Sequence, residues 1–237
     1  MFFKYVKYGL YMLYMQIRGL KYEYIKRFKG IDEATKYSSR CMYNWSRFTI
    51  ETIGIEVQVE GKENIPKGPC VFIGNHTSIL DIPIVYYAAN RIIGFISKKE
   101  ILKVPVLGYW LPRCKCIALD RSDNRDAVRV IKEGVNNIKE GYSMMIFPEG
   151  TRSKDGKLLD FKKGSLKLAT IAKVPIVPIT IDGAFRSFEK ERKFKPEKIR
   201  VIFEKPIETK DMNREEQNYL SIKVKEVIER NLSETFK

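Results

Sequence analysis

The sequence predicts an α/β fold: a mixed, largely parallel sheet flanked by helices and preceded by a separate helical element. From about Ile55 onward, short apolar runs alternate with segments of helical periodicity, the pattern of a parallel sheet covered by helices. Before that point the composition differs. The first fifty residues hold ten Lys or Arg, three Asp or Glu, and 13 of the 28 aromatic residues. We therefore expect an N-terminal element over residues 1–52 and an α/β domain over 53–237.

The N-terminal element is predicted to form two basic, aromatic helices. The first opens with a mostly apolar stretch that is interrupted by Lys4, Lys7 and Arg18. Its longest charge-free run, 8–17, is shorter than the ~20 residues that a transmembrane helix needs. The second helix follows Gly30, with Asp32 as the expected N-cap, and its apolar residues recur at steps of three and four.

Aromatic and basic side chains on one helix suit the headgroup region of a membrane. A helical hairpin packed on its own domain would have the same pattern. We favour binding to a membrane surface with anionic lipid, because both helices are basic and aromatic together.

The α/β domain is predicted from runs of buried apolar residues and from helical periodicity. Strands are expected at 55–59, 70–74, 92–96, 117–119, 143–147, 176–181 and 199–203. Helices are expected at 81–89, 124–139, 164–172 and 213–232.

Composition restricts the partners and the chemistry. A net charge of +15 calls for an anionic partner, such as nucleic acid, anionic lipid or a phosphorylated substrate. No Walker loop or GxGxxG motif is present, which disfavours those modes of nucleotide binding. The four cysteines form no CxxC pair, so we expect neither a zinc site nor a disulfide framework, and a reducing, cytosolic compartment is the default.

Three polar segments follow predicted strands: Asn75-His76, Asp120-Arg121 and residues 147–153 (FPEGTRS). In α/β sheets, sites form at the carboxyl ends of the strands. We therefore expect the three segments to contribute to one composite site.

His76 is the only histidine, and an unperturbed imidazole exchanges protons readily near neutral pH. Asp81 follows five residues later and suggests a base with an orienting carboxylate. Ser78 and Asp81 also fit the spacing of a capping box, in which Asp81 would serve only the start of a helix.

The third segment supplies groups suited to an anion. Gly150 lets backbone approach a ligand closely, Thr151 adds a hydroxyl, and Arg152 adds a guanidinium that suits bidentate contact with phosphate. Arg121 is a candidate second cation. A solvated surface loop would have the same composition.

Together these segments resemble the glycerolipid acyltransferase family. Residues 75–81 (NHTSILD) resemble its HxxxxD motif, and residues 117–121 (IALDR) its second motif. Residues 147–153 are similar to its third motif, FPEGTRS, at every position, and residues 174–179 (VPIVPI) to the fourth. The resemblance spans roughly residues 50–205 in the right order. Lys115 departs from the Gly that many relatives have before the second motif's strand.

The resemblance implies transfer of a fatty acyl group from an acyl thioester, on acyl carrier protein or coenzyme A, to the 2-hydroxyl of lysophosphatidic acid. His76 would be the general base and Asp81 would orient it. Arg152, with Arg121 second, would bind the phosphate in a pocket shaped by Gly150 and Thr151. Glu149 would position Arg or glycerol, and no metal or further cofactor is implied.

The same resemblance places the enzyme at the cytoplasmic face of the cell membrane, bound peripherally. Glycerol-3-phosphate or another lysophospholipid remains an alternative acceptor. A nucleic-acid-binding protein is the alternative from another class, although no binding motif is found and we expect no nucleic acid as partner. A thioester hydrolase or an inactive membrane-binding relative would share the motifs.

Overall fold

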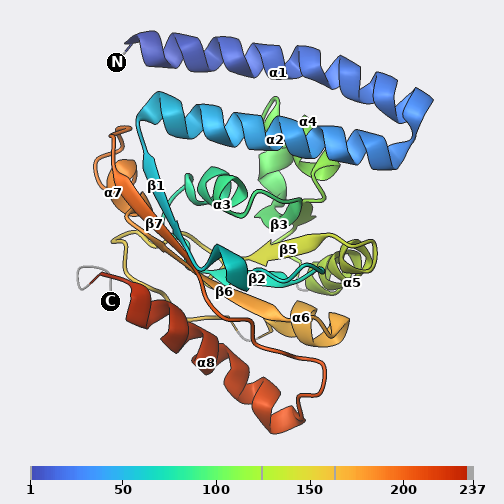
Figure 1. Cartoon of the computed structure of the whole chain (residues 1–237), viewed down its shortest axis with the longest axis vertical. Helices are drawn as coiled ribbons and strands as arrows, with labels where there is room; N and C mark the ends of the chain where they lie inside the picture. The colour runs from blue at the N-terminus through green and yellow to red at the C-terminus, as the bar shows by residue number, and fades with distance from the viewer. Residues whose placement is uncertain (1, 124, 163, 234–237) are drawn as a thin grey trace.

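Seven strands form one sheet in the order β1-β7-β6-β2-β5-β3-β4 in the computed structural model, which describes residues 2–123, 125–162 and 164–233 (Figure 1). The pairs are parallel except β6–β7, which is antiparallel. The predicted mixed, largely parallel sheet is therefore confirmed. The strands are β1 (Glu56–Glu60), β2 (Val71–Gly74), β3 (Ile93–Lys98), β4 (Ile117–Leu119), β5 (Ser143–Ile146), β6 (Ile176–Asp182) and β7 (Lys198–Phe203).

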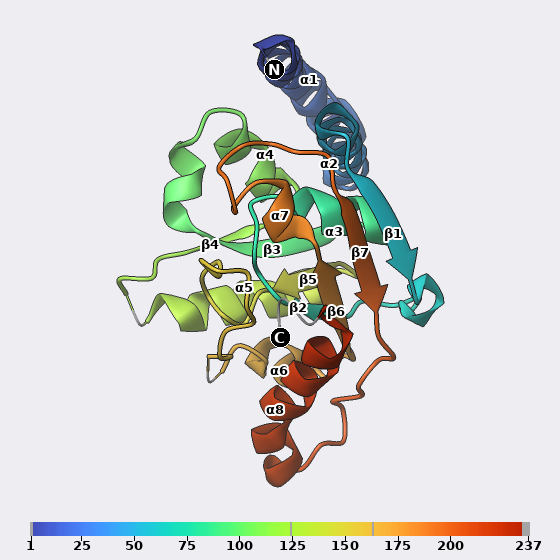
Figure 2. The same cartoon turned by 90° about the vertical axis from the view of Figure 1, so that its left-hand side faces the viewer.

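Helices cover both faces of the sheet, as Figures 1 and 2 show. On one face lie α3 (Asp81–Ala89) and, above it, the hairpin of α1 (Phe2–Lys29) and α2 (Ile31–Ile53). The other face is covered by α5 (Asp126–Lys139), α6 (Lys167–Ala172) and α8 (Arg214–Asn231). The remaining helical segments are η1 (Lys62–Asn64), η2 (Lys99–Lys103), α4 (Leu107–Arg113) and α7 (Ala184–Ser187).

Each face of the sheet has its own apolar core, and neighbouring residues of one strand serve opposite cores. Phe72 packs with the α2–α3 side, whereas Val71 and Ile73 pack with the α5–α8 side. In β5, Met145 and Met144 divide in the same way. Because both faces are covered, these strands appear in the sequence as continuous apolar runs without polar alternation.

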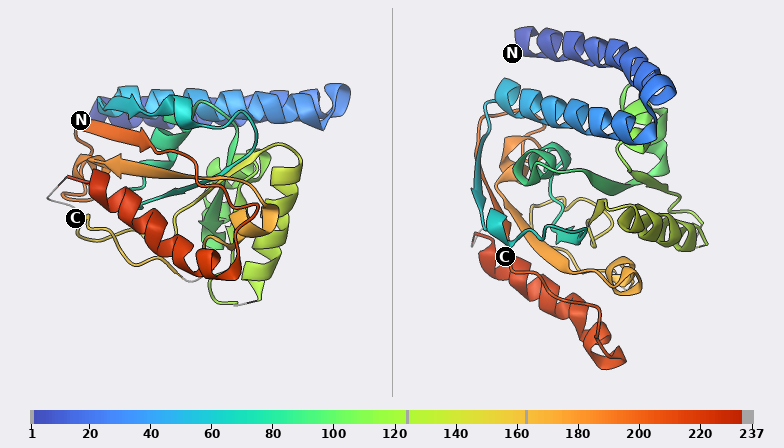
Figure 3. Two further views of the ribbon diagram at one scale, coloured as in Figure 1. Left: turned by 60° about the horizontal axis from the view of Figure 1, so that its bottom comes forward. Right: turned by 45° about the vertical axis from the view of Figure 1, so that its right-hand side comes forward.

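The helical hairpin joins the domain through α2, and α1 also contacts α4, where Trp110 Nε1 donates to the Met15 carbonyl at 3.2 Å. Met42, Ile50 and Ile53 belong to the same buried core as the sheet residues on that face. The outer helix α1 packs along α2 (Figure 3). There the Tyr11 ring stacks on Phe48, with centroids 3.9 Å apart. The α2 helix of the predicted N-terminal element therefore shares a core with the α/β domain.

The outward face of α1 carries a stripe of exposed apolar side chains. Its members recur at steps of three and four, and their exposure ranges from 43% at Val6 to 84% at Phe3. We call them the α1 stripe: Phe3, Val6, Leu10, Leu13, Ile17, Leu20, Tyr24 and Phe28. Among the described residues, no helix is both long and apolar enough to cross a membrane.

Several predicted boundaries differ from the structure. Gly30, not Asp32, is the N-cap of α2. Asp32 lies in the first turn, where its negative charge interacts favourably with the helix dipole. The predicted start of a helix at Asn124 lies outside the described residues, and α5 begins at Asp126. Gly164, at φ 89°, lies outside α6, which begins at Lys167.

Candidate active site

The site forms where two neighbouring parallel strands end. The loop after β2 carries Asn75 and His76, and the segment after β5 carries residues 147–153. Asn75 fixes the start of its loop, because its side-chain amide donates to the Ile181 carbonyl (2.9 Å) and accepts from the Ile181 N–H (2.8 Å). The side chain thus continues the β2–β6 pairing one residue beyond β2.

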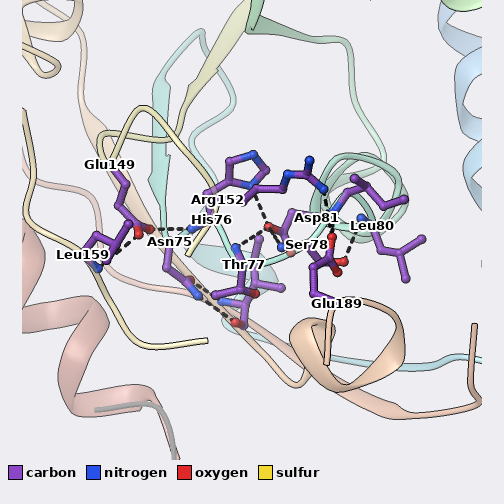
Figure 4. Close-up of polar contacts among 12 residues, drawn as sticks. Asn75, His76, Thr77, Ser78, Leu80, Asp81, Glu149, Arg152, Leu159 and Glu189 are labelled. Atoms are coloured by element: carbon purple, nitrogen blue, oxygen red, sulfur yellow. Dashed lines mark hydrogen bonds and ion pairs between the residues drawn. The ribbon is translucent and has the colours of Figure 1, made fainter. Parts of the chain in front are cut away.

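His76 and Asp81 face each other across the turn that leads into α3 (Figure 4). The distance between His76 Nδ1 and Asp81 Oδ2 is 2.8 Å, and the Asp81 side chain is fully buried. The same oxygen accepts hydrogen bonds from the Thr77 N–H (2.8 Å) and the Ser78 N–H (2.9 Å). With Nδ1–H donating to Asp81, the other ring nitrogen, Nε2, is left to accept a proton.

The sequence predicts Asp81 either as a partner of His76 or as a residue that serves the start of a helix, and in the structure it is both. The helix begins at Asp81 itself, with Leu80 at its N-cap, so Ser78 is not the N-cap that a capping box would require. Ser78 nevertheless takes part in the turn, since its Oγ accepts from the Leu80 N–H at 3.1 Å. One carboxylate therefore closes the turn before α3 and orients the imidazole.

Residues of the segment after β5 contact His76 at its backbone N–H, its carbonyl and its imidazole ring. The His76 N–H donates to Glu149 Oε1 (2.6 Å), and the His76 carbonyl accepts from the Ser153 N–H (2.9 Å). The imidazole stacks on the Phe147 ring, with centroids 4.1 Å apart and planes 13° apart. Phe147 is a site residue that the sequence reasoning missed.

Glu149 contacts the backbone N–H of His76. Its second oxygen, Oε2, accepts from the Leu159 N–H at 3.1 Å, so the buried carboxylate bridges two loops. Burial raises the pKa of Glu149 to about 7, against the lowering effect of these two N–H donors. No hydrogen bond or ion pair joins Glu149 to Arg152 in the part of the chain that the structure describes.

Gly150 has a left-handed conformation that favours glycine. Its φ is 68°, and a Cβ at this position would lie 2.8 Å from Cε and Nζ of Lys162. Thr151 and Arg152 follow on the surface of the same loop.

Arg152 is held by a residue that sequence reasoning did not single out. Its Nη1 donates to Glu189 Oε1 at 3.0 Å, and the same oxygen accepts from the Ile79 N–H at 2.8 Å. Glu189 lies just after α7 and is 110 residues from Ile79, so only the folded chain brings it here.

Arg121 lies at the same edge of the sheet but farther along it. Its strand, β4, is three places from β2 in the strand order, which corresponds to roughly 14 Å. Its side chain is exposed. Contribution of Arg121 to the site remains a prediction, whereas the structure brings together His76, Asp81, Glu149 and Arg152.

A metal site was not expected. Across residues 2–123, 125–162 and 164–233, no group of three or more His, Cys, Asp or Glu side chains is placed to hold a metal ion.

Curated proteins named 1-acyl-sn-glycerol-3-phosphate acyltransferase match more than half of the chain. The chain is 38% identical over 156 residues to the chloroplastic 1-acyl-sn-glycerol-3-phosphate acyltransferase of Brassica napus, covering 64% of this chain and 45% of that protein. It is 36% identical over 143 residues to the 1-acyl-sn-glycerol-3-phosphate acyltransferase of Pseudomonas aeruginosa, covering 57% and 54%. The chain spans about half the length of the curated relatives that it matches.

A solved structure matches almost the whole chain. The crystal structure of the 1-acyl-sn-glycerophosphate (LPA) acyltransferase PlsC from Thermotoga maritima superposes with a TM-score of 0.78 at 29% identity, covering 96% of this chain and 95% of that one. The family model described as Acyltransferase matches residues 56–182, which include the strand ends that carry His76 and residues 147–153. Because the match extends over more than half of the 237 residues, the chain belongs to the acyltransferase family.

Proposed function

We propose that this chain transfers a fatty acyl group from an acyl thioester to the 2-hydroxyl of 1-acylglycerol-3-phosphate (lysophosphatidic acid), giving phosphatidic acid for phospholipid biosynthesis. The observation that carries the proposal is the 2.8 Å pair of His76 and Asp81 at the same sheet edge as the Arg152 guanidinium. Relatives named for this reaction, at 36–38% identity, support the choice of acceptor.

The reaction begins at the acceptor hydroxyl. Nε2 of His76 removes its proton while the hydroxyl oxygen attacks the thioester carbonyl carbon, forming a C–O bond. The C–S bond then breaks, and the thiolate leaves with the proton that the imidazolium returns. Asp81 stabilises the imidazolium and keeps Nε2 directed at the acceptor. General base catalysis of this kind contributes typically ~10²–10⁴ in rate.

The acceptor's phosphate would bind the guanidinium of Arg152. Arginine presents paired N–H donors that match phosphate oxygens, and the surface position of Arg152 leaves it open to a ligand. Gly150 and Thr151 would border that pocket, and Arg121 would add a second positive charge.

The helical hairpin would hold the enzyme at an anionic membrane surface. The α1 stripe is of the kind that enters the headgroup and acyl boundary, and the basic residues of the hairpin would attract anionic lipid. We place the enzyme peripherally on the cytoplasmic face of the cell membrane, where acyl carrier protein or coenzyme A thioesters would reach it.

The test is acyl transfer from a long-chain acyl thioester to lysophosphatidic acid in liposomes, with the parent and His76→Ala. We expect the parent to form phosphatidic acid and the variant to be slower by roughly 10²-fold or more. Ser78→Ala is the control for a covalent nucleophile and should retain activity within about tenfold.

Other outcomes redirect the proposal. Equal activity of parent and His76→Ala would exclude His76 as the base. Transfer by the parent only to glycerol-3-phosphate or to another lysophospholipid would replace the acceptor while keeping the chemistry. An acyl-enzyme that accumulates in the parent would overturn direct transfer.

A further inference from the structure

Glu189 joins the two ends of the proposed site through a single atom. Its Oε1 accepts both the hydrogen bond from Arg152 Nη1 (3.0 Å) and that from the Ile79 N–H (2.8 Å), as Figure 4 shows. Ile79 lies two residues before Asp81 in the turn that orients His76. One carboxylate oxygen therefore ties the phosphate-binding candidate to the turn that carries the base.

The Glu189 carboxylate is buried and has hydrogen-bond partners on only one of its two oxygens among the described residues. Its side chain is only 6% exposed, and its second oxygen, Oε2, is buried without a hydrogen-bond partner among the described residues. A buried, half-satisfied carboxylate is costly, because the unpaired oxygen has lost its water.

The contact leaves Arg152 free to bind an anion. Only Nη1 is engaged in the described part of the chain, so the edge formed by Nε and Nη2 has no protein partner there. A phosphate can bind bidentately along that edge while Glu189 keeps its place. The geometry therefore favours a Glu189 that positions the Arg152 guanidinium over a Glu189 that competes with phosphate for it.

Resting on the proposed function, we infer that Glu189 is a positioning residue that sets the separation between the phosphate anchor, Arg152, and the general base, His76. A fixed separation selects acceptors by the distance between phosphate and reacting hydroxyl. The class that it would take is a phosphomonoester whose free hydroxyl is on the neighbouring carbon of a glycerol backbone.

The test measures acceptor and donor kinetics for variants of Glu189. Glu189→Ala frees both the guanidinium and the Ile79 N–H, and it should raise the KM for lysophosphatidic acid about tenfold while leaving the donor KM unchanged, a difference of ~1.4 kcal/mol. Glu189→Gln keeps an oxygen of equal reach and should restore the acceptor KM to within about threefold of the parent.

Two further variants test the length of the side chain at position 189 and the loss of a negative charge close to it. Glu189→Asp keeps the charge but is one methylene shorter, so it should resemble Glu189→Ala. Glu191→Ala is the matched control, since Glu191 is two residues away and, among the described residues, forms an ion pair only with Lys195 on the surface. Its kinetics should equal the parent's. In an Arg152→Ala background, Glu189→Ala should add nothing to the acceptor KM, because its effect passes through Arg152.

The inference would be overturned if the acceptor KM stays unchanged or falls in both Glu189→Ala and Glu189→Asp. A fall would mean that Glu189 competes with phosphate for Arg152. A parent that acylates no acceptor would instead contradict the proposed function. Calorimetric binding of glycerol-3-phosphate then tests Glu189 by itself. About tenfold weaker binding to Glu189→Ala than to the parent supports the inference, whereas equal binding, or none to the parent, overturns it.

Discussion

The loop around His76 and the outer helix α1 are held in opposite ways. At the loop, the Asp81 oxygen accepts three hydrogen bonds, and the backbone of His76 is bonded through both its N–H and its carbonyl. In α1, the inner face packs on α2 through rings such as Tyr11 and Phe48, while the outer face leaves its apolar stripe exposed. Hydrogen bonds concentrate at the loop, where the proposed mechanism moves a proton between fixed atoms. Exposed apolar side chains lie instead along α1, whose proposed role needs only contact with a membrane surface.

The largest effect is expected from removing one charge, that of Asp81, from the loop. In Asp81→Asn, the amide oxygen can accept the three hydrogen bonds, while the NH₂ takes the place of Oδ1, the Asp81 oxygen that has no partner in the part of the chain that the structure describes. The fold should survive, but the imidazolium loses its counter-charge. We expect kcat to fall by roughly 10²–10⁴-fold.

Steady-state kinetics with saturating donor and acceptor measure this effect, and thermal unfolding provides the control. A loss of less than about tenfold in a folded variant would mean that the charge of Asp81 is dispensable.

The buried Glu149 carboxyl is expected to make the stability of the fold depend on pH. The pKa of Glu149 is about 7 in the folded chain, above its ordinary value of 4.5. A raised carboxyl pKa means that its contribution to the free energy of unfolding is fully present below pH 4.5 and is lost as the pH rises through about 7. The difference corresponds to about 3 kcal/mol.

Denaturant unfolding at pH 4.5 and pH 8 measures this loss in the parent and in Glu149→Gln. The parent should lose about 3 kcal/mol more than the variant between the two pH values, because the amide does not ionise. Parallel pH profiles would show that Glu149 is not buried as an ionisable group.

The smallest expected effect is a single change on α1. Leu13→Glu places a charge in the α1 stripe, and it should weaken binding to anionic liposomes by about tenfold or more, since a buried Leu side chain contributes ~1.5–3 kcal/mol. Flotation or sedimentation with liposomes measures the partition coefficient.

Gln16→Glu is the matched control. It adds the same charge to the same helix at an exposed position outside the stripe, and it should change binding by no more than a few-fold. Equal weakening by both variants would assign binding to net charge and not to the stripe.

Much of the sheet could be predicted because its strands are buried on both faces. Residues 71–73 and 144–146 are apolar without interruption, and they lie in neighbouring central strands, β2 and β5. The helix over 107–113 escaped prediction because it is short and contains Pro112. The antiparallel pairing of β6 with β7 depends on a long-range partner choice that local periodicity does not encode.

The site divides in a similar way. His76, Asp81 and residues 147–153 could be singled out because their residue types and the ends of their strands are visible in the sequence. Phe147 was within a recognised segment, but its stacking on His76 depends on the side-by-side placement of β2 and β5. Glu189 carried no signal, since it lies in a charged stretch and meets Arg152 and Ile79 only through the tertiary position of the chain after α7.

The stack of His76 on Phe147 also provides a spectroscopic reporter. A proton above an aromatic ring is shielded by the ring current, so the imidazole resonances of His76 are displaced from those of a free histidine. With one histidine in 237 residues, the two carbon-bound imidazole protons give an unambiguous pair of signals that needs no assignment by mutation. The protonation of the proposed base can therefore be followed directly in the intact chain, with and without acceptor, by nuclear magnetic resonance.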